Sequence, residues 1–465
     1  MARPRVFIGF GETSGYCAGL KRGFDELGVP AVSFMIRENR FQFDDSGRGR
    51  LLASIRAILK QREALQARSE KTASLSAKLG CALGRLALAL AQNAVWLAVL
   101  VWAVARFDVF ILQGRASFIN VFRLPVKPRF LDLAVLKLFR KKIIYVFHGT
   151  DSRPAYLNGS IGTRGLNARQ LIRYSRRQAR DVGTIEKYAD AILHYPLNTH
   201  FHRKKIISHE YMGRPVFVAQ SGVRRDPAAG ETPVRIVHAP SDPVGKGSDG
   251  IREIIGRLRQ KGRSIDFIEL VDRRNEDVKE SLQNCDFLVD QLYYDAAISY
   301  LATEAAFLGK PAVIGTYAME DLRKTAPGGS LPPVYLCAPD QLERAIEELV
   351  TDRDLRRRLG ARAKEFVEAR YGPKRVAENF LRLINRDAPG EWLFDPKTLE
   401  YCRGYGYAEK DLRAVVRGIV QQGGESVLSL DDKPALKEKL LRFAFDNPPA
   451  GAPGVGQAVL EGTTG

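Results

Sequence analysis

The sequence predicts an α/β protein of two doubly wound domains, followed by a small helical appendage. Short apolar runs alternate with helix-like segments along most of the chain, which is the pattern of parallel sheets covered by helices. The chain has 465 residues, more than one domain usually holds, and two domains are therefore expected. Hydrophobic residues make up 45% of the chain and charged residues 27%, a balance that is typical of globular proteins with packed cores.

The first domain is expected over residues 1–220. Its first segment, 5–28, has the pattern of a strand, a glycine loop and a helix. The loop is spaced like a dinucleotide-binding turn, but that function requires an acidic residue at the end of the second strand, where Arg37 stands. We therefore expect a tight turn that directs the first helix across an interdomain cleft. The further elements expected in this domain are strands at 31–35, 109–112, 142–147 and 188–193 and helices at 132–137 and 173–191.

A helical insertion is expected at 48–105. Its first part, 48–78, is basic and helix-prone, and residues 86–105 form a run of twenty residues without a charge. A run of this length would suffice to cross a membrane. A single crossing would, however, separate the strands at 6–8 and 109–112, which should share one sheet. The alternatives that keep the domain whole are a buried helix and a helix lying in the membrane interface beside the basic segment.

The second domain is expected over residues 221–372, with its linker at 216–233. Beyond it we expect a helix at 373–390 that returns to the first domain, a helical appendage at 391–446, and a disordered tail rich in Pro, Gly and Ala at 447–465. The elements expected in this half are strands at 235–238, 265–270, 287–289 and 312–315 and helices at 251–258, 277–283, 299–308, 342–351, 354–370, 375–384, 412–420 and 434–445.

The most informative stretch is 290–317. An apolar strand ends at Asp290, a loop with small residues follows, and a helix and a buried strand come next. Ligands of parallel α/β sheets bind where strand C-termini and helix N-termini meet, and the free amides of a helix N-terminus suit a phosphate. Glu304, one to two turns inside the helix, could accept hydrogen bonds from sugar or ribose hydroxyls, or could be a solvated helix residue.

The sequence T-E-A-A-F-L-G-K-P-A-V, which begins at Thr303, resembles the E-A-x-x-x-G-x-P-V segment of retaining, nucleotide-sugar-dependent glycosyltransferases of the GT-B type, family four. The resemblance covers roughly residues 5–385 and implies two Rossmann-like domains facing across a cleft. It also implies that Glu304 holds the nucleotide ribose and that the backbone amides of Ala296, Ala297, Ile298 and Ser299 bind the phosphates. The first glutamate of the family's pair is absent, because Ala296 stands there.

A second motif follows the strand at 235–238. The loop A-P-S-D-P-V-G-K-G resembles the family's strand-loop-K-G step, which implies that Lys246 neutralises the departing diphosphate and that Gly247 adjoins the donor. Fixed cations and helix-end amides would stabilise the negative charge that forms when the sugar–phosphate bond breaks. The family's arginine, five residues earlier, is replaced by Ser241. On the residues alone, Lys246 could also be a surface lysine.

A third motif, His148-Gly149-Thr150-Asp151, resembles the H-G-[ST]-D turn of one bacterial branch of the family. The resemblance implies that His148 and Asp151 face the cleft and contact donor sugar or acceptor; His148 could instead bond its own turn. Arg153 is a candidate for an anionic acceptor. The glycine loop adds Gly11 to the donor-binding candidates and Gly9 to the acceptor side.

Composition narrows the partners. The formal charge of +19 indicates an anionic partner, such as a membrane surface or a phosphorylated substrate. No nucleic-acid-binding signature and no zinc spacing are found, and the four histidines between 194 and 209 lie among no cysteines. We expect no metal and no cofactor, with a nucleoside-diphosphate sugar as co-substrate. Five scattered cysteines and no visible signal peptide favour the cytoplasm, with peripheral attachment to the cytoplasmic face of the membrane as an option.

The expected function is that of a metal-independent, retaining hexosyltransferase. It would move a sugar from a nucleoside-diphosphate sugar to a saccharide or lipid-linked acceptor in cell-envelope polysaccharide synthesis. A catalytically silent GT-B-like binding or scaffold subunit remains an alternative, because of the departures at Ala296 and Ser241. A nucleotide-sugar epimerase on the same fold is the third alternative.

Overall fold

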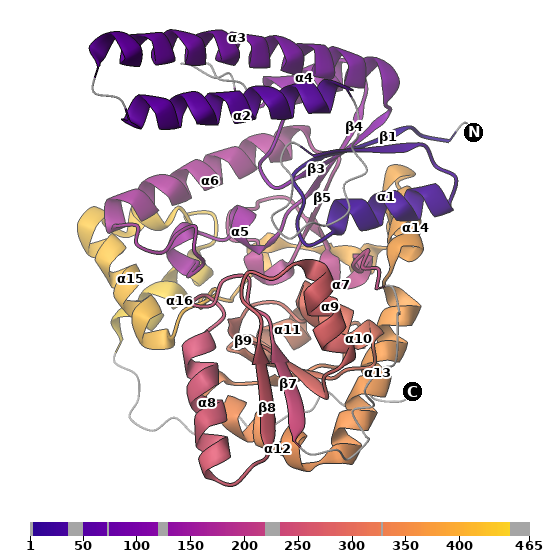
Figure 1. Ribbon diagram of the computed structural model, residues 1–465, viewed down its shortest axis with the longest axis vertical. Coiled ribbons are helices and arrows are strands. Elements are labelled where there is room, and N and C mark those ends of the chain that lie inside the picture. The colour runs from indigo at the N-terminus through magenta and orange to yellow at the C-terminus, as the bar shows by residue number, and fades with distance from the viewer. Residues whose placement is uncertain are drawn as a thin grey trace.

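Two parallel β-sheets, each covered by helices, form the body of the molecule (Figure 1). The computed structural model describes residues 3–35, 50–71, 74–119, 129–218, 233–326 and 329–446. The linker expected at 216–233 lies largely outside the described residues, and the tail expected at 447–465 lies outside them entirely.

The first sheet is built around β1 (Val6–Phe10), whose side chains are all buried. This strand pairs in parallel with β2 (Ala31–Met35) on one side and with β3 (Val109–Gln113) on the other. The sheet order is β12-β6-β5-β4-β3-β1-β2. Its other members are β4 (Lys142–Val146), β5 (Ala191–His194), β6 (Ile206–Ser208) and the antiparallel β12 (Leu393–Phe394).

The second sheet repeats this arrangement, with the order β11-β10-β9-β7-β8. In both sheets the first strand lies between the second and the third, so the strand order reverses beside it, which is where doubly wound folds bind ligands. The predicted pair of Rossmann-like domains is confirmed. The strands are β7 (Val234–His238), β8 (Ile265–Glu269), β9 (Phe287–Tyr294), β10 (Ala312–Thr316) and β11 (Tyr335–Cys337).

The strand β9 differs from its prediction. It does not end at Asp290 but continues to Tyr294. Its pairing with β10 shifts register between Val313 and Ile314, which lets the longer strand bend beside its neighbour. As a result Asp290 is fully buried within the strand instead of opening a loop.

The helical hairpin of α2 (Arg50–Lys71) and α3 (Leu75–Arg106) lies at the end of the molecule farthest from the second sheet (Figure 1). One side of α3 is core, because Trp96, Val99 and Ala103 are fully buried and Trp96 contacts the ring of Phe10 at 5.5 Å between ring centres. The helix from Ser76 to Arg106 is long and apolar enough to cross a membrane, with 33% of its most apolar window buried. Its other side carries the exposed residues Leu79, Leu83, Leu86, Leu90, Leu97 and Val101, called the α3 stripe below.

The helix α6 (Ala168–Tyr188) begins earlier than the sequence predicted. Asn167 and Gln170 form a reciprocal cap, in which the Gln170 amide donates to Asn167 Oδ1 at 3.0 Å and the Asn167 amide donates to Gln170 Oε1 at 2.9 Å. The remaining helices of the first domain are α1 (Tyr16–Glu26), α4 (Leu131–Leu138), α5 (Gly149–Ser152) and α7 (His209–Met212).

The helix α14 (Pro373–Ile384) leaves the second domain and packs beside α1 (Figure 1). The approach is close: a Cβ atom on Gly23 would lie 2.0 Å from the carbonyl oxygen of Pro373. Helices of the second domain are α8 (Ser248–Gln260), α9 (Asn275–Gln283), α10 (Tyr300–Phe307), α11 (Met319–Thr325), α12 (Leu342–Thr351) and α13 (Arg353–Arg370).

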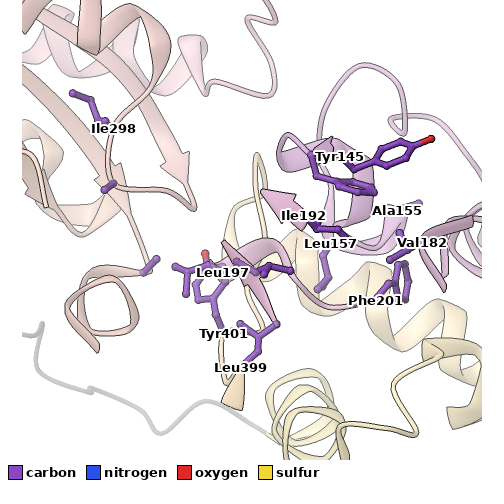
Figure 2. Packing of buried hydrophobic residues seen from close by; sticks show 14 of the residues in the cluster. Tyr145, Ala155, Leu157, Val182, Ile192, Leu197, Phe201, Ile298, Leu399 and Tyr401 are labelled. Atoms are coloured by element: carbon purple, nitrogen blue, oxygen red, sulfur yellow. The ribbon is translucent and has the colours of Figure 1, made fainter. Parts of the chain in front are cut away.

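The sequence predicted a purely helical C-terminal segment. The structure differs, because β12 of this segment adds a strand to the first sheet. Its helix α15 (Glu409–Gly423) lies beside α6 and its helix α16 (Pro434–Phe445) packs against α15 (Figure 1). Tyr156 Oη donates to the carbonyl oxygen of Leu428 at 2.8 Å. In Figure 2, Leu399 and Tyr401 of this segment lie near Leu197 of the first domain, within one buried cluster. The segment therefore belongs to the packed body of the molecule.

Candidate functional site

A cavity of about 580 Å³ lies between the two domains. It is formed where β1, β4, β7 and β9 end and their following loops and helices begin, as expected for doubly wound domains. Residues of both domains line it, and one residue of the C-terminal segment, Tyr405, does so as well.

Lys246 lies in the loop between β7 and α8 and faces this cavity. Gly247 follows it in the left-handed conformation, with φ 74°, as the N-cap residue directly before α8. A side chain at Gly247 would collide with Leu292, since its Cβ would lie 2.7 Å from that of Leu292. Lys246 is 8% exposed as a residue, and its ammonium group pairs with Asp290 Oδ1 at 2.9 Å. Lys246 is thus a fixed, partly buried cation and not a solvated surface lysine.

Asp290 is the partner that holds Lys246 in place. Its second carboxylate oxygen accepts a hydrogen bond from Gln291 Nε2 at 2.9 Å, and Gln291 itself lines the cavity. The longer course of β9 makes this possible, because it carries Asp290 under the loop of Lys246. Sequence spacing alone did not reveal this contact.

Glu304 also faces the cavity, from α10. Burial raises the pKa of its carboxyl group to about 7, while Lys279, with Nζ 3.8 Å away, lowers it in part. Such a group can accept or donate a hydrogen bond near neutral pH. The prediction that Glu304 is a solvated helix residue is wrong, because the side chain is 8% exposed and lies against the cavity.

The loop before α10 is only partly available to a ligand. Ala296 and Ser299 line the cavity, and Ser299 Oγ caps α10 by accepting from the Ala302 amide at 3.0 Å. Ala297 and Ile298 do not line it. The carbonyl oxygen of Ile298 instead accepts from Arg214 Nη2 at 2.8 Å, so these two residues turn toward the protein interior.

His148 enters the cavity from the other domain, at the end of β4. Burial lowers the pKa of its imidazole to about 4, so the ring is neutral at pH 7. Within the described residues neither ring nitrogen has a hydrogen-bond partner. The ring stacks near that of His209, at 5.9 Å between centres, and its two nitrogens are buried without a partner in the described part of the chain.

Asp151 is a correction to the sequence prediction, because it does not line the cavity. Its carboxylate accepts from the backbone amide of His148 at 2.7 Å and closes the turn that carries the histidine. It also lies against Gly114, where a Cβ atom would approach Oδ1 to 2.8 Å. Burial raises the pKa of Asp151 to about 6. Its observed contacts position His148.

Arg153 lines the cavity but is already bonded to a carboxylate. Its Nε donates to Asp295 Oδ2 at 2.6 Å and its Nη2 to Asp295 Oδ1 at 2.7 Å. Both residues are almost completely buried, and they come from different domains. The guanidinium lies 5.0 Å from the ring centre of Tyr405. Arg153 therefore links the domains instead of standing free for an anionic acceptor.

The glycine loop reaches the cavity through other residues than those expected. Gly9 lies inside β1 against the Phe7 ring, and Gly11 does not line the cavity. Glu12, with its neighbours Thr13 and Ser14, lines it instead. The carboxylate of Glu12 accepts from the amides of the first residues of α1, and burial raises its pKa to about 7.

Asp242 and Tyr405 were not anticipated. Asp242 accepts from the amide of Ile161 at 2.7 Å and thereby joins the two domains beside the cavity. Its position in the loop before Lys246 offered a local signal. Tyr405 lies more than 100 residues away in the chain from every other lining residue, and nothing in its local sequence indicates a cavity.

The histidines do not form a metal site. No group of three or more metal-ligating side chains exists within the described ranges. Each of the histidines between 194 and 209 has a protein partner: His194 contacts Ser152 Oγ at 2.6 Å, His200 the Tyr401 carbonyl at 3.1 Å, His202 Glu186 at 3.1 Å, and His209 the Phe147 carbonyl at 3.1 Å.

The cavity thus combines a fixed cation, a helix N-terminus, a carboxyl group with a pKa near 7 and a neutral imidazole. The first two suit a phosphorylated ligand, and the last two suit hydroxyl groups. The second domain supplies the phosphate-binding features and the first domain supplies the imidazole.

The sequence matches no protein-family model and no curated protein. Among solved structures, Anabaena HepE in complex with UDP and glucose is similar at 12% identity, over 83% of this chain and 100% of that chain, with a TM-score of 0.40. The catalytic domain of starch synthase IV from Arabidopsis thaliana, bound to ADP and acarbose, is similar at 13% identity, over 83% of this chain and 99% of that chain, with a TM-score of 0.44. Os79 from O. sativa in complex with UDP is similar at 11% identity, over 82% of this chain and 100% of that chain, with a TM-score of 0.38. At these values the likenesses carry no inference about reaction or substrate.

Proposed function

We propose that this chain is a glycosyltransferase that transfers a sugar from a nucleoside-diphosphate sugar to a saccharide acceptor. The observation that carries the proposal is the cavity itself, where Lys246 and the N-terminus of α10 face His148 across the two domains. A diphosphate requires fixed positive charge, and a sugar requires hydrogen-bonding groups on its far side. The two domains provide one each.

In the proposed reaction, the donor's diphosphate binds between Lys246 and the N-terminus of α10. As the bond between sugar and phosphate breaks, negative charge grows on the diphosphate, and the fixed ammonium group and the helix amides stabilise it without reorganising. Lys246 can do so without a new desolvation cost, because it is already buried beside Asp290. The proposal assigns this charge stabilisation to the protein and requires no metal ion.

Glu304 is proposed to bind ribose hydroxyls, and His148 a hydroxyl of the transferred sugar. A neutral imidazole offers one donor and one acceptor, which suits a hydroxyl group better than an imidazolium would. Asp151 positions this ring through the backbone of its turn. Retention of anomeric configuration and transfer of a hexose are further parts of the proposal, and they rest on the sequence resemblance.

The acceptor is proposed to be a saccharide, either free or linked to lipid, in cell-envelope polysaccharide synthesis on the cytoplasmic side of a membrane. The α3 stripe supports a lipid-linked acceptor. Its six large apolar side chains are 54–62% exposed, and an apolar helix face of this kind can enter a bilayer interface. The net charge of +19 would favour an anionic lipid surface.

The first test is thermal stability with UDP, GDP, ADP, CMP and NAD, for wild type and Lys246→Ala. A ligand that binds only the folded state at about 100 times its Kd adds about 2.7 kcal/mol. We expect one nucleoside diphosphate to stabilise the wild type and to stabilise Lys246→Ala much less. If none does, the proposal fails and a scaffold, which the departures at Ala296 and Ser241 favour, takes its place.

The second test separates the remaining alternative. Purified protein is incubated with the sugar form of the stabilising nucleotide, with and without saccharide acceptors. Release of free nucleotide supports sugar transfer or hydrolysis, whereas conversion of the sugar with the nucleotide still attached would show an epimerase and contradict the proposal.

A further inference from the structure

A second, larger hollow lies outside the cleft, between α6 and the C-terminal segment. It has a volume of about 1200 Å³, and we call it the α6–α15 groove. One wall is α6 and the other is the end of α15 with the turn that follows it, at Gln422, Gly423, Ser426, Val427 and Ser429. The proposed reaction uses none of these residues.

The α6 wall is basic along its whole length. This wall carries cations spaced three or four positions apart, at residues 169, 173, 176 and 180. The next cation, at 187, comes seven positions later, and Gly183 and Thr184 lie between them. This spacing places them on one face of the helix. From the first to the last, the row spans about 27 Å at about 1.5 Å per residue. The side chains are Arg169, Arg173, Arg176, Arg180 and Lys187, and all are exposed.

These five cations have no ion pair within the described residues. A sixth cation, Arg203, lies at the groove and is 3.6 Å from Asp432. The carboxylate that lines the groove, Asp431, is bonded to Lys437 at 3.0 Å and does not neutralise the row. A row of like charges repels itself, so an anionic partner would relieve a repulsion that the protein alone leaves in place.

The lining residues also limit what that partner can be. Stacked bases need aromatic platforms, and none of the described residues lining the groove is aromatic. A bilayer needs protruding apolar side chains, whereas the large apolar residues here, Ile172 and Val427, form the buried floor. Hydroxyl and amide groups at Thr184, Gln422 and Ser426 suit the hydroxyls of a sugar chain.

We infer that the α6–α15 groove binds an anionic saccharide chain carrying carboxylate, sulfate or phosphate groups. On the proposed function, which this last step presupposes, the chain is the distal part of the acceptor. The loop that leads into α6 supports this step, because Ser160 and Ile161 of that loop line the central cavity. The groove would then hold an acidic polymer while its growing end reaches the cleft.

The test is a binding measurement on the full chain, by isothermal titration without any nucleotide. The probes are an octasaccharide of galacturonic acid, a sulfated heparin-derived octasaccharide and the neutral maltooctaose. The groove variant is Arg173→Glu/Arg176→Glu. The matched control is Arg353→Glu/Arg358→Glu on α13, which makes the same change of charge at exposed positions of the other domain.

We expect an acidic octasaccharide to bind the wild type and maltooctaose not to bind. The groove variant should lose about tenfold or more in affinity, about 1.4 kcal/mol or more, and the control should stay close to the wild type. A preference for the carboxylated or the sulfated probe would identify the acidic group. Equal losses in both variants, equal binding of maltooctaose, or no binding at all would overturn the inference.

Two further probes address other polyanions. Tighter groove-dependent binding of oligothymidylate, or groove-dependent capture by vesicles of anionic phospholipid, would also overturn it. Both variants should retain the wild-type melting temperature, which shows that they are folded. If the wild type binds an octasaccharide but no nucleotide, the result would contradict the proposed function and leave the groove assignment standing. The reverse result would contradict the groove alone.

Discussion

Replacing Arg153 by methionine would remove the cation of the buried pair that joins the two domains. The change breaks two hydrogen bonds to Asp295 and a third to Asn158 Oδ1, at 3.2 Å. Asp295 is 1% exposed and would be left as a buried carboxylate without its counter-ion. Removing one partner of such a pair costs about 3–5 kcal/mol, chiefly because the other charge stays desolvated.

The expected melting shift follows from the size of the chain. An unfolding entropy of about 2.1 cal/mol/K per residue gives about 1 kcal/mol/K for a chain of this length when both domains unfold together, so the melting temperature should fall by about 3–5 °C. Burial already raises the pKa of Asp295, and Arg153 opposes this. Without Arg153, the folded state should bind a proton at Asp295 more tightly than the unfolded state does. The loss of stability should therefore shrink as pH is lowered toward about 4.

The assay is a double-mutant cycle by thermal unfolding, with Arg153→Met, Asp295→Leu and the double variant. The double variant replaces both charges by apolar side chains and should be more stable than the sum of the single effects predicts, by about 2 kcal/mol or more. If the two single effects simply add, the pair is not coupled and the assignment of Arg153 as a link between domains is refuted. The control is the exposed pair of Arg263 and Glu347, for which the same cycle should give about 0–1 kcal/mol.

Three further predictions concern the cavity and the hairpin. Lys246→Ala should lower turnover about 100-fold or more, by analogy with removing one group that stabilises transition-state charge. It should also lower the melting temperature by about 3–5 °C, because the fully buried Asp290 loses its counter-ion. A turnover assay with the nucleotide sugar that stabilises the wild type, run well below the melting temperature of the variant, checks the effect on turnover. Burial raises the pKa of Glu304 to about 7, so the folded state binds the proton of this carboxyl group more tightly than the unfolded state does. The free energy of unfolding should therefore fall as pH rises from about 4.3 toward 7. Urea unfolding of Glu304→Gln should show less of this fall, and a pH profile equal to that of the wild type would contradict the prediction. Leu86→Ser/Leu90→Ser should reduce co-sedimentation with anionic vesicles, without lowering the melting temperature; retained co-sedimentation would remove the α3 stripe from the proposal.

The elements that the sequence predicted well are those defined by short-range pattern. The strand β1 and the helix α16 follow from continuous apolar runs and from spacing, and each was placed within two residues of its observed ends. The early start of α6 was also readable, because Asn167 and Gln170 form a capping box signature that the prediction did not use. The extension of β9 was not, because an acidic residue after an apolar run usually ends a strand. Here Asp290 is tolerated inside the strand since Lys246, 44 residues earlier in the chain, compensates its charge.

In the candidate site too, local motifs identified the residues but did not predict their contacts with residues distant in sequence. Lys246, Glu304 and His148 could be selected from local motifs, and all three line one cavity. What each side chain does there depends on partners distant in sequence. Arg153 is bonded to Asp295, 142 residues away, and no local pattern distinguishes this from an arginine that awaits a substrate. Asp151 illustrates the opposite case, because its role in closing the His148 turn involves a residue only three positions away, and a capping reading of the motif would have found it.

The charges of the two hollows suggest different relations to their ligands. In the cavity, Lys246 and Arg153 are each paired with a buried carboxylate, so the charges of these two cations are compensated before a ligand enters. An anion bound there gains from helix amides and from a cation that is already partly compensated, which favours a ligand that must also leave. In the α6–α15 groove, five exposed cations have no ion pair within the described residues. Their attraction is spread over about 27 Å and weakened by salt, which suits a long polymer held at many points and able to slide. A transferase that extends an acidic chain would need both behaviours, release of the spent nucleotide at one site and retention of the polymer at the other.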